Sequence, residues 1–235
     1  MTASRGSDAL DCAGCPVRDR AACAALPDGE RAELARMGRH RDLVRGEMLF
    51  APGDDSACAT LLSGVLKVVR TDADGVERIV ALIHPAGFAG EIFAAPDDCE
   101  VTAAGAARVC IFPRADYARM VTENPRLAAG VARRAMKAAS ETRALLDLVG
   151  RRRAEAKVAG LILALADAAG AAPCSPAARF DLPLTRGEMA ALLGISIETV
   201  SRQLGALEEA GLIRRHGARG LEVRDAPALA ALLAD

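Results

Sequence analysis

The chain has 235 residues, of which 51% are hydrophobic and 26% charged, and its formal net charge is −1. This length fits one or two domains with a sizeable buried core. Aromatic residues make up only 3% of the chain, so base stacking on aromatic platforms is not expected, and the near-zero charge excludes a wholesale polybasic binder of nucleic acid or membranes.

Three of the seven cysteines lie within residues 12–23. No charged segment followed by an apolar core precedes them, so a secretory signal is not expected. The most apolar stretch, residues 158–166, is too short to span a membrane. We therefore expect a cytoplasmic protein, in which a tight cysteine cluster favours metal or redox chemistry over structural disulfides.

The first part of the chain divides into an arm and a predicted sensor domain. Residues 1–28 form a cysteine-bearing N-terminal arm with little periodicity, and a short helix is expected from about residue 29 to 40. Between residues 42 and 112, short apolar runs alternate with turn sequences such as Pro52-Gly53. Many short strands at this spacing predict an all-β roll or sandwich, which we assign to a sensor domain of residues 29–120.

A long helix is predicted over residues 121–149, where Pro125 suits a first helical turn. Small and apolar residues recur along it at a spacing of three to four, and we take the following as the dimerisation stripe: Val131, Ala135, Ala139, Thr142, Leu146 and Val149. A narrow stripe of small residues suits a close seam between two helices. An ordinary core-packed helix is the alternative.

Residues 150–235 are predicted to form a helical domain that ends in a two-stranded wing. Thr185 and Glu188 match a capping box at the start of one helix, Ser196 is suited to cap a second helix, and Gly194 between them can adopt positive φ. The expected buried faces are Met189, Leu192 and Leu193 in the first helix and Ile197, Val200, Leu204 and Leu207 in the second.

The second of these helices leaves polar residues outward near its start, as a DNA-recognition helix does. They are Glu198, Thr199, Ser201, Arg202 and Gln203. Arginine can form a fork to guanine, glutamate can accept from the cytosine amine, and serine can contact a base or a phosphate. We also assign Arg186 in the first helix and the wing residues Arg214, Arg215 and Arg219 to DNA contacts, the wing arginines to phosphates. A helical hairpin with solvated charges is the alternative.

The segment Gly-Ile-Ser-Ile-Glu-Thr-Val-Ser-Arg at 194–202, behind a glycine-punctuated β-roll and a long helix, resembles the CRP/FNR family of bacterial transcription regulators. The resemblance covers essentially the whole chain. It implies an α+β fold with an N-terminal β-roll (a double-stranded β-helix like that of cyclic-nucleotide-binding domains), a dimerisation helix and a C-terminal winged helix-turn-helix over residues 150–235. In the FNR branch, the pattern formed by Glu198, Ser201 and Arg202 implies that a homodimer binds a palindrome of the TTGAT…ATCAA type in double-stranded DNA.

The resemblance leaves two kinds of signal to compare. Members that bind cyclic nucleotides carry a Gly-Glu pair followed by an Arg-Ser pair. Here Gly90-Glu91 is present, but residues 94–103 contain acidic side chains and no arginine, so a cyclic phosphate would lack its partner. Cyclic-nucleotide binding is therefore not expected, and Gly90-Glu91 is interpreted as a structural turn.

Members of the FNR branch instead bind a [4Fe–4S] cluster through three cysteines in the arm and one in the β-roll. The resemblance implies that Cys12, Cys15, Cys23 and Cys110 are these ligands, although Cys15 and Cys23 are further apart than in the best-known pattern. Thiolates are the ligands that such clusters need. Arg18 and Arg20 between these cysteines would offset their negative charge.

Other assignments of the cysteines stay open. A zinc site with the same four donors and thiol redox sensing without a cluster are the alternatives, and Cys99 is the rival fourth ligand. Cys58 and Cys174 are interpreted as ordinary small apolar residues.

The sequence as a whole predicts an oxygen-responsive regulator that is not an enzyme. His40, His84 and His216 are scattered, and no pairing of a nucleophile with a base is evident. The resemblance also implies a contact with RNA polymerase, for which we consider the loop around residues 171–180. A regulator that senses a small ligand without metal, and an iron–sulfur electron-transfer protein, are the remaining alternatives.

Overall fold

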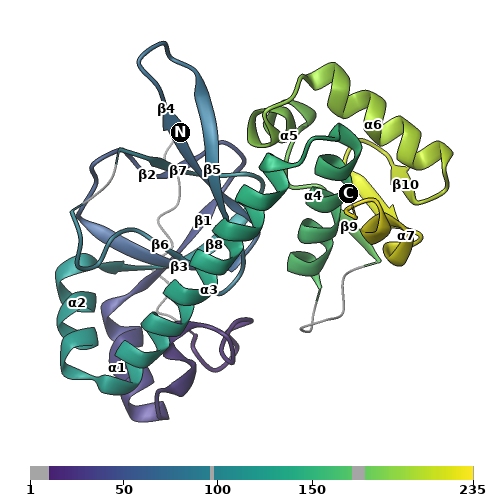
Figure 1. The fold of residues 1–235 in the computed structure, drawn as a ribbon. Helices are drawn as coiled ribbons and strands as arrows, with labels where there is room; N and C mark the ends of the chain where they lie inside the picture. Colours follow the sequence, from purple (N-terminus) through teal and green to yellow (C-terminus); the bar gives the residue numbers. More distant parts are fainter. Residues whose placement is uncertain (1–10, 96–97, 171–177, 235) are drawn as a thin grey trace, which may run out of the picture. The chain divides into compact units, whose positions relative to one another are not determined.

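A computed structural model describes residues 11–95, 98–170 and 178–234. The chain forms two compact units (Figure 1). The first contains the residues up to Glu141 except 77–79, and the second contains the rest. The boundary between them falls inside one long helix, α3 (Pro125–Gly150).

Two four-stranded sheets form the predicted β-roll, which the structure confirms. Their strand orders are β1-β8-β3-β6 and β2-β7-β4-β5. The strands are β1 (Arg39–Leu43), β2 (Met48–Phe50), β3 (Ala57–Ser63), β4 (Leu66–Thr71), β5 (Glu77–Ile83), β6 (Phe88–Ala89), β7 (Glu100–Ala103) and β8 (Ala107–Pro113). Gly64 joins β3 to β4 at φ +85°, and a side chain there would lie 2.4 Å from the Ala106 carbonyl oxygen. Only glycine fits this turn without displacing the backbone.

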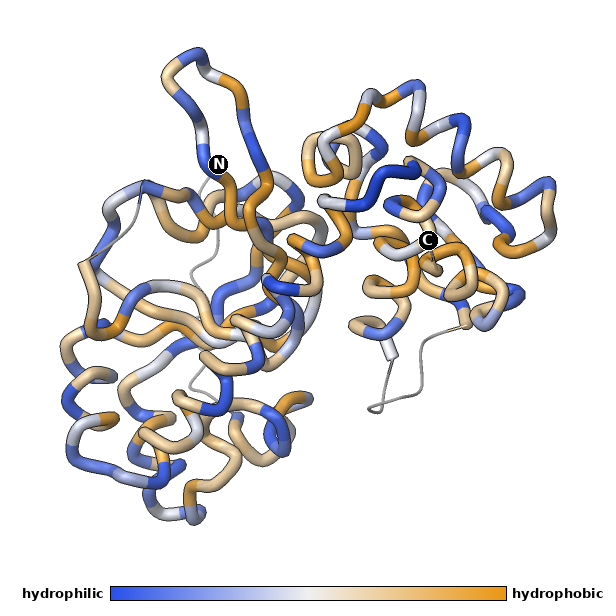
Figure 2. The backbone as a smooth tube through the Cα atoms, in the orientation of Figure 1, coloured by the Kyte–Doolittle hydropathy of each residue, from blue (hydrophilic) through white to orange (hydrophobic). Residues whose placement is uncertain are grey.

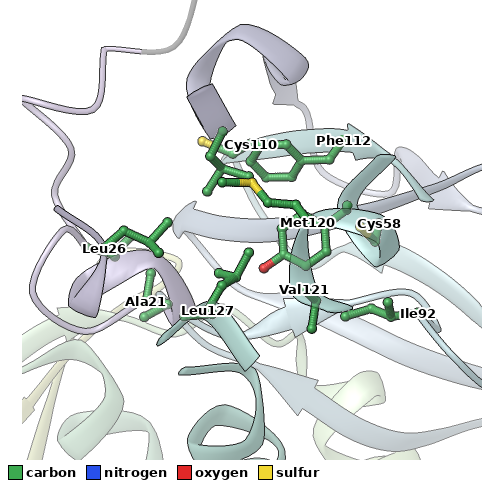
Figure 3. Close-up of a cluster of buried hydrophobic side chains, with 14 of the residues drawn as sticks. Ala21, Leu26, Cys58, Ile92, Cys110, Phe112, Met120, Val121 and Leu127 are labelled. Atoms are coloured by element: carbon green, nitrogen blue, oxygen red, sulfur yellow. The ribbon is translucent and has the colours of Figure 1, made fainter. Parts of the chain in front are cut away.

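The strands β3 and β8 separate two hydrophobic cores. Because side chains alternate along a strand, Val109 and Ile111 of β8 face the core between the sheets, whereas Cys110 and Phe112 face a second core. Helices α1 (Asp28–Met37), α2 (Arg114–Glu123) and the start of α3 contribute Leu34, Tyr117 and Leu127, among others, to this second core. Figure 3 shows Cys110 and Phe112 facing this cluster of side chains.

The N-terminal arm is an integral part of the second core, which its lack of periodicity did not indicate. Val17, Ala21, Ala22 and Leu26 are each at most 4% exposed. The arm contains a short 3-10 helix, η1 (Ala22–Ala25), before α1 begins. Two of the four are alanines, and Val17 and Leu26 lie in irregular backbone, so no helical or strand pattern marks them as buried.

The long helix begins four residues later than predicted. A proline disfavours helical backbone at the residue before it. The helix α2 therefore ends at Glu123, and α3 begins at Pro125. The Asn124 side-chain oxygen caps the new helix by accepting from the backbone amides of Arg126 at 3.0 Å and Leu127 at 3.1 Å. The N-terminal helix is likewise shorter than expected, since β1 already begins at Arg39.

The second unit contains helices and one small sheet. Its further elements are α4 (Ala154–Ala169), β9 (Arg179–Asp181), α5 (Arg186–Leu193), α6 (Ile197–Glu209), β10 (Ile213–His216), β11 (Gly220–Val223) and α7 (Ala226–Ala231). The predicted two-stranded wing is a three-stranded sheet in the order β10-β11-β9. The additional strand, β9, has only three residues and pairs Phe180 with Leu221, so it carried no alternation to detect.

The apolar stretch at 158–166 is the buried part of α4, which packs inside the second unit. By contrast, α6 alternates hydrophobic and hydrophilic positions along its length (Figure 2). Among the helices of the described residues, none combines the length and apolarity needed to cross a membrane.

Candidate DNA-binding helix and cysteine pocket

The predicted helix-turn-helix is present with its caps. The Thr185 hydroxyl oxygen accepts from the Glu188 amide at 3.1 Å, and the Glu188 carboxylate accepts from the Thr185 amide at 2.7 Å, which completes the capping box. Gly194 ends α5 in left-handed backbone at φ +63°. The Ser196 hydroxyl oxygen then accepts from the Thr199 amide at 3.2 Å and starts α6. These local bonds fix where the second helix begins.

The buried face of α6 holds the unit together and leaves its opposite face free. Val200, Leu204 and Leu207 are each at most 1% exposed, as predicted. Ile197, which was expected on the same face, is instead 51% exposed. It is the first residue of the helix, so no preceding turn covers it, and its Cδ1 atom lies toward Gly187 of α5.

The outward side chains at the start of α6 form a charged, hydrogen-bonding surface. Glu198 is exposed, and hydrogen bonds from its own backbone amide and from the Ser196 hydroxyl lower the pKa of its carboxyl. Arg202 is exposed and donates to the Thr199 hydroxyl at 3.4 Å. Arg186 of α5 donates to the Ser201 hydroxyl at 3.4 Å. An ionised acceptor and two arginines thus lie on one polar surface, which is suited to the edges of base pairs.

The wing arginines differ in their surroundings. Arg214 of β10 is exposed. Arg215 is paired with Glu208 of α6, because its Nε atom donates to the carboxylate at 2.6 Å and its backbone amide donates at 2.8 Å. Arg215 therefore ties the wing to the recognition helix, a structural role that sequence reasoning missed.

The four cysteines assigned as ligands line one pocket in the first unit. Three of them come from the arm, and the fourth, Cys110, comes from β8, where it pairs with His40 of β1 and Thr60 of β3. The cavity is small, with a volume of about 30 Å³. Its other lining residues are Val17, Ala21, Leu34, Thr60, Leu62, Phe112 and Tyr117.

The remaining cysteines lie elsewhere. Cys58 is fully buried in the same core but does not line the pocket, and burial raises the pKa of its thiol to about 12. Cys99 is not among the pocket residues. Cys174 lies outside the described residues.

Burial and mutual repulsion oppose ionisation of the pocket thiols. Burial raises the pKa of Cys12, Cys23 and Cys110, and the neighbouring pocket cysteines raise each pKa further. The guanidinium of Arg31 opposes this effect at Cys12 and Cys23. Several thiolates would therefore coexist here only with a positively charged partner between them.

Arg31 is a buried cation that acts on Cys12 and Cys23 without lining the pocket itself. It is 7% exposed and donates to the Asp28 carboxylate at 2.8 Å and to the Ala24 carbonyl oxygen at 3.3 Å. A further bond to the Leu26 carbonyl oxygen fastens the end of the arm to α1. Within the described part of the chain, its Nε atom has no hydrogen-bond partner.

The four thiols fit an iron–sulfur cluster in their chemistry, but the distances between them in this structure are not those of ligands around one metal site. Four thiols from one pocket match a cubane in number and chemistry. Among residues 11–95, 98–170 and 178–234, however, no three His, Cys, Asp or Glu side chains are spaced as ligands of one metal ion. A cubane is larger than this cavity, so the side chains that line it would have to rearrange to admit one.

The Gly-Glu turn that cyclic-nucleotide-binding members share has a structural role here. Gly90 adopts φ +92°, and a side chain there would lie 3.0 Å from the Ala57 carbonyl oxygen. Arg114 fastens the following segment by donating to the carbonyl oxygens of Ile92 at 3.2 Å and Ala94 at 2.9 Å. The interpretation of this motif as a turn agrees with these contacts.

The β-roll, the long helix and the exposed face of α6 together define a DNA-binding transcription regulator. Comparison with known proteins agrees: residues 40–124 match the cyclic nucleotide-binding domain and residues 156–232 match the Crp-like helix-turn-helix domain. The chain therefore belongs to the CRP/FNR family of transcription regulators.

Relatives and solved structures cover most of the chain. A "probable transcriptional activator" of Rhizobium leguminosarum is 35% identical over 91% of this chain and 89% of its own length. The transcriptional activator protein FnrL of Cereibacter sphaeroides is 33% identical over 91% of this chain and 88% of its own. The structure of FixK2 from Bradyrhizobium japonicum superposes with a TM-score of 0.73 at 20% identity, over 83% of this chain and 96% of that one.

The recognition helix and the wing are expected to differ in what they contribute to DNA binding. Arg202→Ala should cost about 1–3 kcal/mol per half-site and relax discrimination at one base pair. Arg214→Ala should weaken binding to all sequences alike. It should also lower the slope of log affinity against log salt concentration by about one, as expected for the loss of one phosphate contact. Titration of each variant against operator and scrambled duplexes at several salt concentrations separates the two. Equal loss of affinity for both duplexes in Arg202→Ala would contradict its role in base recognition.

Proposed function

We propose that the protein is an oxygen-responsive transcription regulator that holds a [4Fe–4S] cluster through Cys12, Cys15, Cys23 and Cys110. As a homodimer it binds a palindrome of the TTGAT type. The observation that carries the proposal is the pocket itself. Three cysteines of the arm and one of a distant strand line the same cavity, while Cys58 and Cys99 do not.

The pocket joins two separate parts of the first unit. Cys110 is fixed by hydrogen bonding of β8 to strands on both sides, whereas the three arm cysteines belong to a segment with only the short helix η1. When bound, the cluster supplies an oxygen-sensitive link between thiolates. The link would hold the arm on the β-roll while the cluster persists. Without it, the arm would be held by its apolar contacts and by the hydrogen bonds from Arg31, which is a population shift between two states.

Two alternatives use the same four residues. A tetrahedral zinc site takes four thiolates, and a thiol switch needs no metal at all. The pocket thiols do not favour the second alternative, because redox-sensor cysteines have a low pKa, whereas burial raises the pKa of Cys12, Cys23 and Cys110. An iron–sulfur electron-transfer protein would not need the polar face of α6.

Exposed residues of α3 support the proposed homodimer. Ala135, Ala139, Thr142 and Leu146 of the predicted stripe are exposed, Leu146 at 67%, while Val131 and Val149 are half-buried. An exposed stripe of small and apolar residues on a 26-residue helix is typical of a surface that pairs with another helix. Pairing would present two recognition helices to half-sites one helical turn apart, about 34 Å.

A contact with RNA polymerase is a further part of the proposal. The loop considered for it lies mostly outside the described residues, which resume at Ala178. This part of the proposal rests only on the match to a family of transcription regulators.

Loss of one pocket cysteine should abolish the cluster, and the chain offers a matched control. Cys110 and Cys58 are both buried in strands that border the same core, so replacing either by alanine removes one thiol at similar structural cost. After anaerobic purification, Cys58→Ala should keep about four iron and four sulfide per chain, as a [4Fe–4S] cluster requires, and Cys110→Ala should lose them. A colourless wild-type protein without iron or sulfide would refute the cluster, and stoichiometric zinc would establish the first alternative.

A charge on the stripe of α3 should prevent dimerisation. Ala139 lies on the stripe, and Ser140 lies about 100° further around the helix; both are exposed. Ala139→Glu would bring like charges together at a two-fold seam, so we expect a monomer by analytical ultracentrifugation under anaerobic conditions. Ser140→Glu should remain a dimer. If both variants dimerise as the wild type does, the stripe is not the seam.

A further inference from the structure

The arm contacts the long helix backbone to backbone at one position. A side chain at Gly130 of α3 would place its Cβ atom 1.9 Å from the carbonyl oxygen of Ala22 and 2.8 Å from its carbonyl carbon. Both partners are backbone atoms, so no rotamer change relieves such a clash. Only a residue without a side chain lets η1 lie this close to α3.

Apolar packing surrounds this contact on both sides. Leu127, one turn before Gly130, is fully buried in the core that contains Ala21, Ala22 and Leu26 of the arm. Figure 3 shows Ala21 and Leu26 beside Leu127. Val131, the first residue of the proposed dimer stripe, also packs against this core. The arm therefore covers the part of α3 that leads directly into the stripe.

The contact is also adjacent to the cysteine pocket. Cys23 follows Ala22 in the chain and lines the pocket, and Ala21 lines it as well. A displacement of the Cys23 backbone relative to Cys110 would therefore also move the neighbouring Ala22 backbone that rests on Gly130.

Arg134, one turn after Gly130, is a partly buried cation near the docked arm. Burial lowers the pKa of its guanidinium, the Glu141 carboxylate of the same helix raises it, and Arg20 of the arm lowers it by a smaller amount. The Nε atom of Arg134 is buried with no hydrogen-bond partner in the described part of the chain.

We propose that Gly130 is a positioning residue: it forms the notch in which the arm docks on α3, and through it the state of the cysteine pocket reaches the dimerisation helix. The coupling rests on the proposed function, whereas the docking itself does not require a cluster. A bulkier residue at 130 separates the arm from α3 while the four cysteines and the stripe remain unchanged.

The test compares Gly130→Ala with Gly29→Ala. Both add one methyl group inside a helix, but the added methyl group at Gly29 has no atom within 4 Å. In the metal-free, reduced protein, iodoacetamide should alkylate Cys12, Cys15 and Cys23 about ten-fold faster or more in Gly130→Ala than in the wild type, because overpacking shifts the docking equilibrium. Gly29→Ala should match the wild type, and mass spectrometry of peptides identifies each cysteine.

A second measurement tests the coupling. In the anaerobically reconstituted proteins, cluster loss on air exposure should change the monomer–dimer equilibrium of the wild type and Gly29→Ala, and this change should be absent in Gly130→Ala. Equal alkylation rates in all three proteins would overturn the docking notch. Faster alkylation together with an unchanged response of dimerisation to air would overturn the coupling.

The outcomes separate this inference from the proposed function. If the wild type takes up no cluster but Gly130→Ala still exposes the arm cysteines, the notch stands and the cluster proposal fails. Should Gly130→Ala not fold, Leu127→Val provides the same readout, because it removes arm packing without a clash. Unchanged alkylation in that variant would equally overturn the notch.

Discussion

The burial of the N-terminal arm is the constraint on which the rest of the first unit depends. Val17, Ala21, Ala22 and Leu26 are inside the core rather than on it, so removing the arm would expose the outer face of β3 and β8. Burying four such side chains contributes several kcal/mol, and the same packing brings three thiols to one place. Arg31 adds to it by binding carbonyl oxygens at the end of the arm.

The position of the fourth cysteine follows from strand geometry. On β8, neighbouring residues face opposite cores, so a shift of one residue in register would direct Cys110 between the sheets, away from the arm. Pairing of Cys110 with His40 on one side and Thr60 on the other excludes such a shift. An arm with mostly irregular backbone thus meets a strand that is hydrogen-bonded on both sides, an arrangement that suits the proposed sensor.

Local signals explain how much could be predicted from the sequence. The helix-turn-helix depends on bonds between residues three apart, such as Thr185 with Glu188, so its caps and the αL glycine Gly194 were predictable. The buried arm was not, because alanines in irregular backbone leave no periodic pattern. Strand β9 was too short to detect, and Ile197 was misplaced because the helical pattern does not show that a first residue lacks a covering turn. The tight contact at Gly130 depends on a partner more than a hundred residues away in the chain, so no sequence window contains it.

The central proposal is that the state of the cysteine pocket controls binding to DNA. The most direct measurement is the affinity of the anaerobically purified protein for a duplex with a TTGAT…ATCAA palindrome, before and after exposure to air, with iron content followed in the same sample. We expect tight, sequence-specific binding before exposure and a large loss of affinity as the cluster is lost. Equal affinity in both states would contradict it and leave a regulator whose signal lies elsewhere.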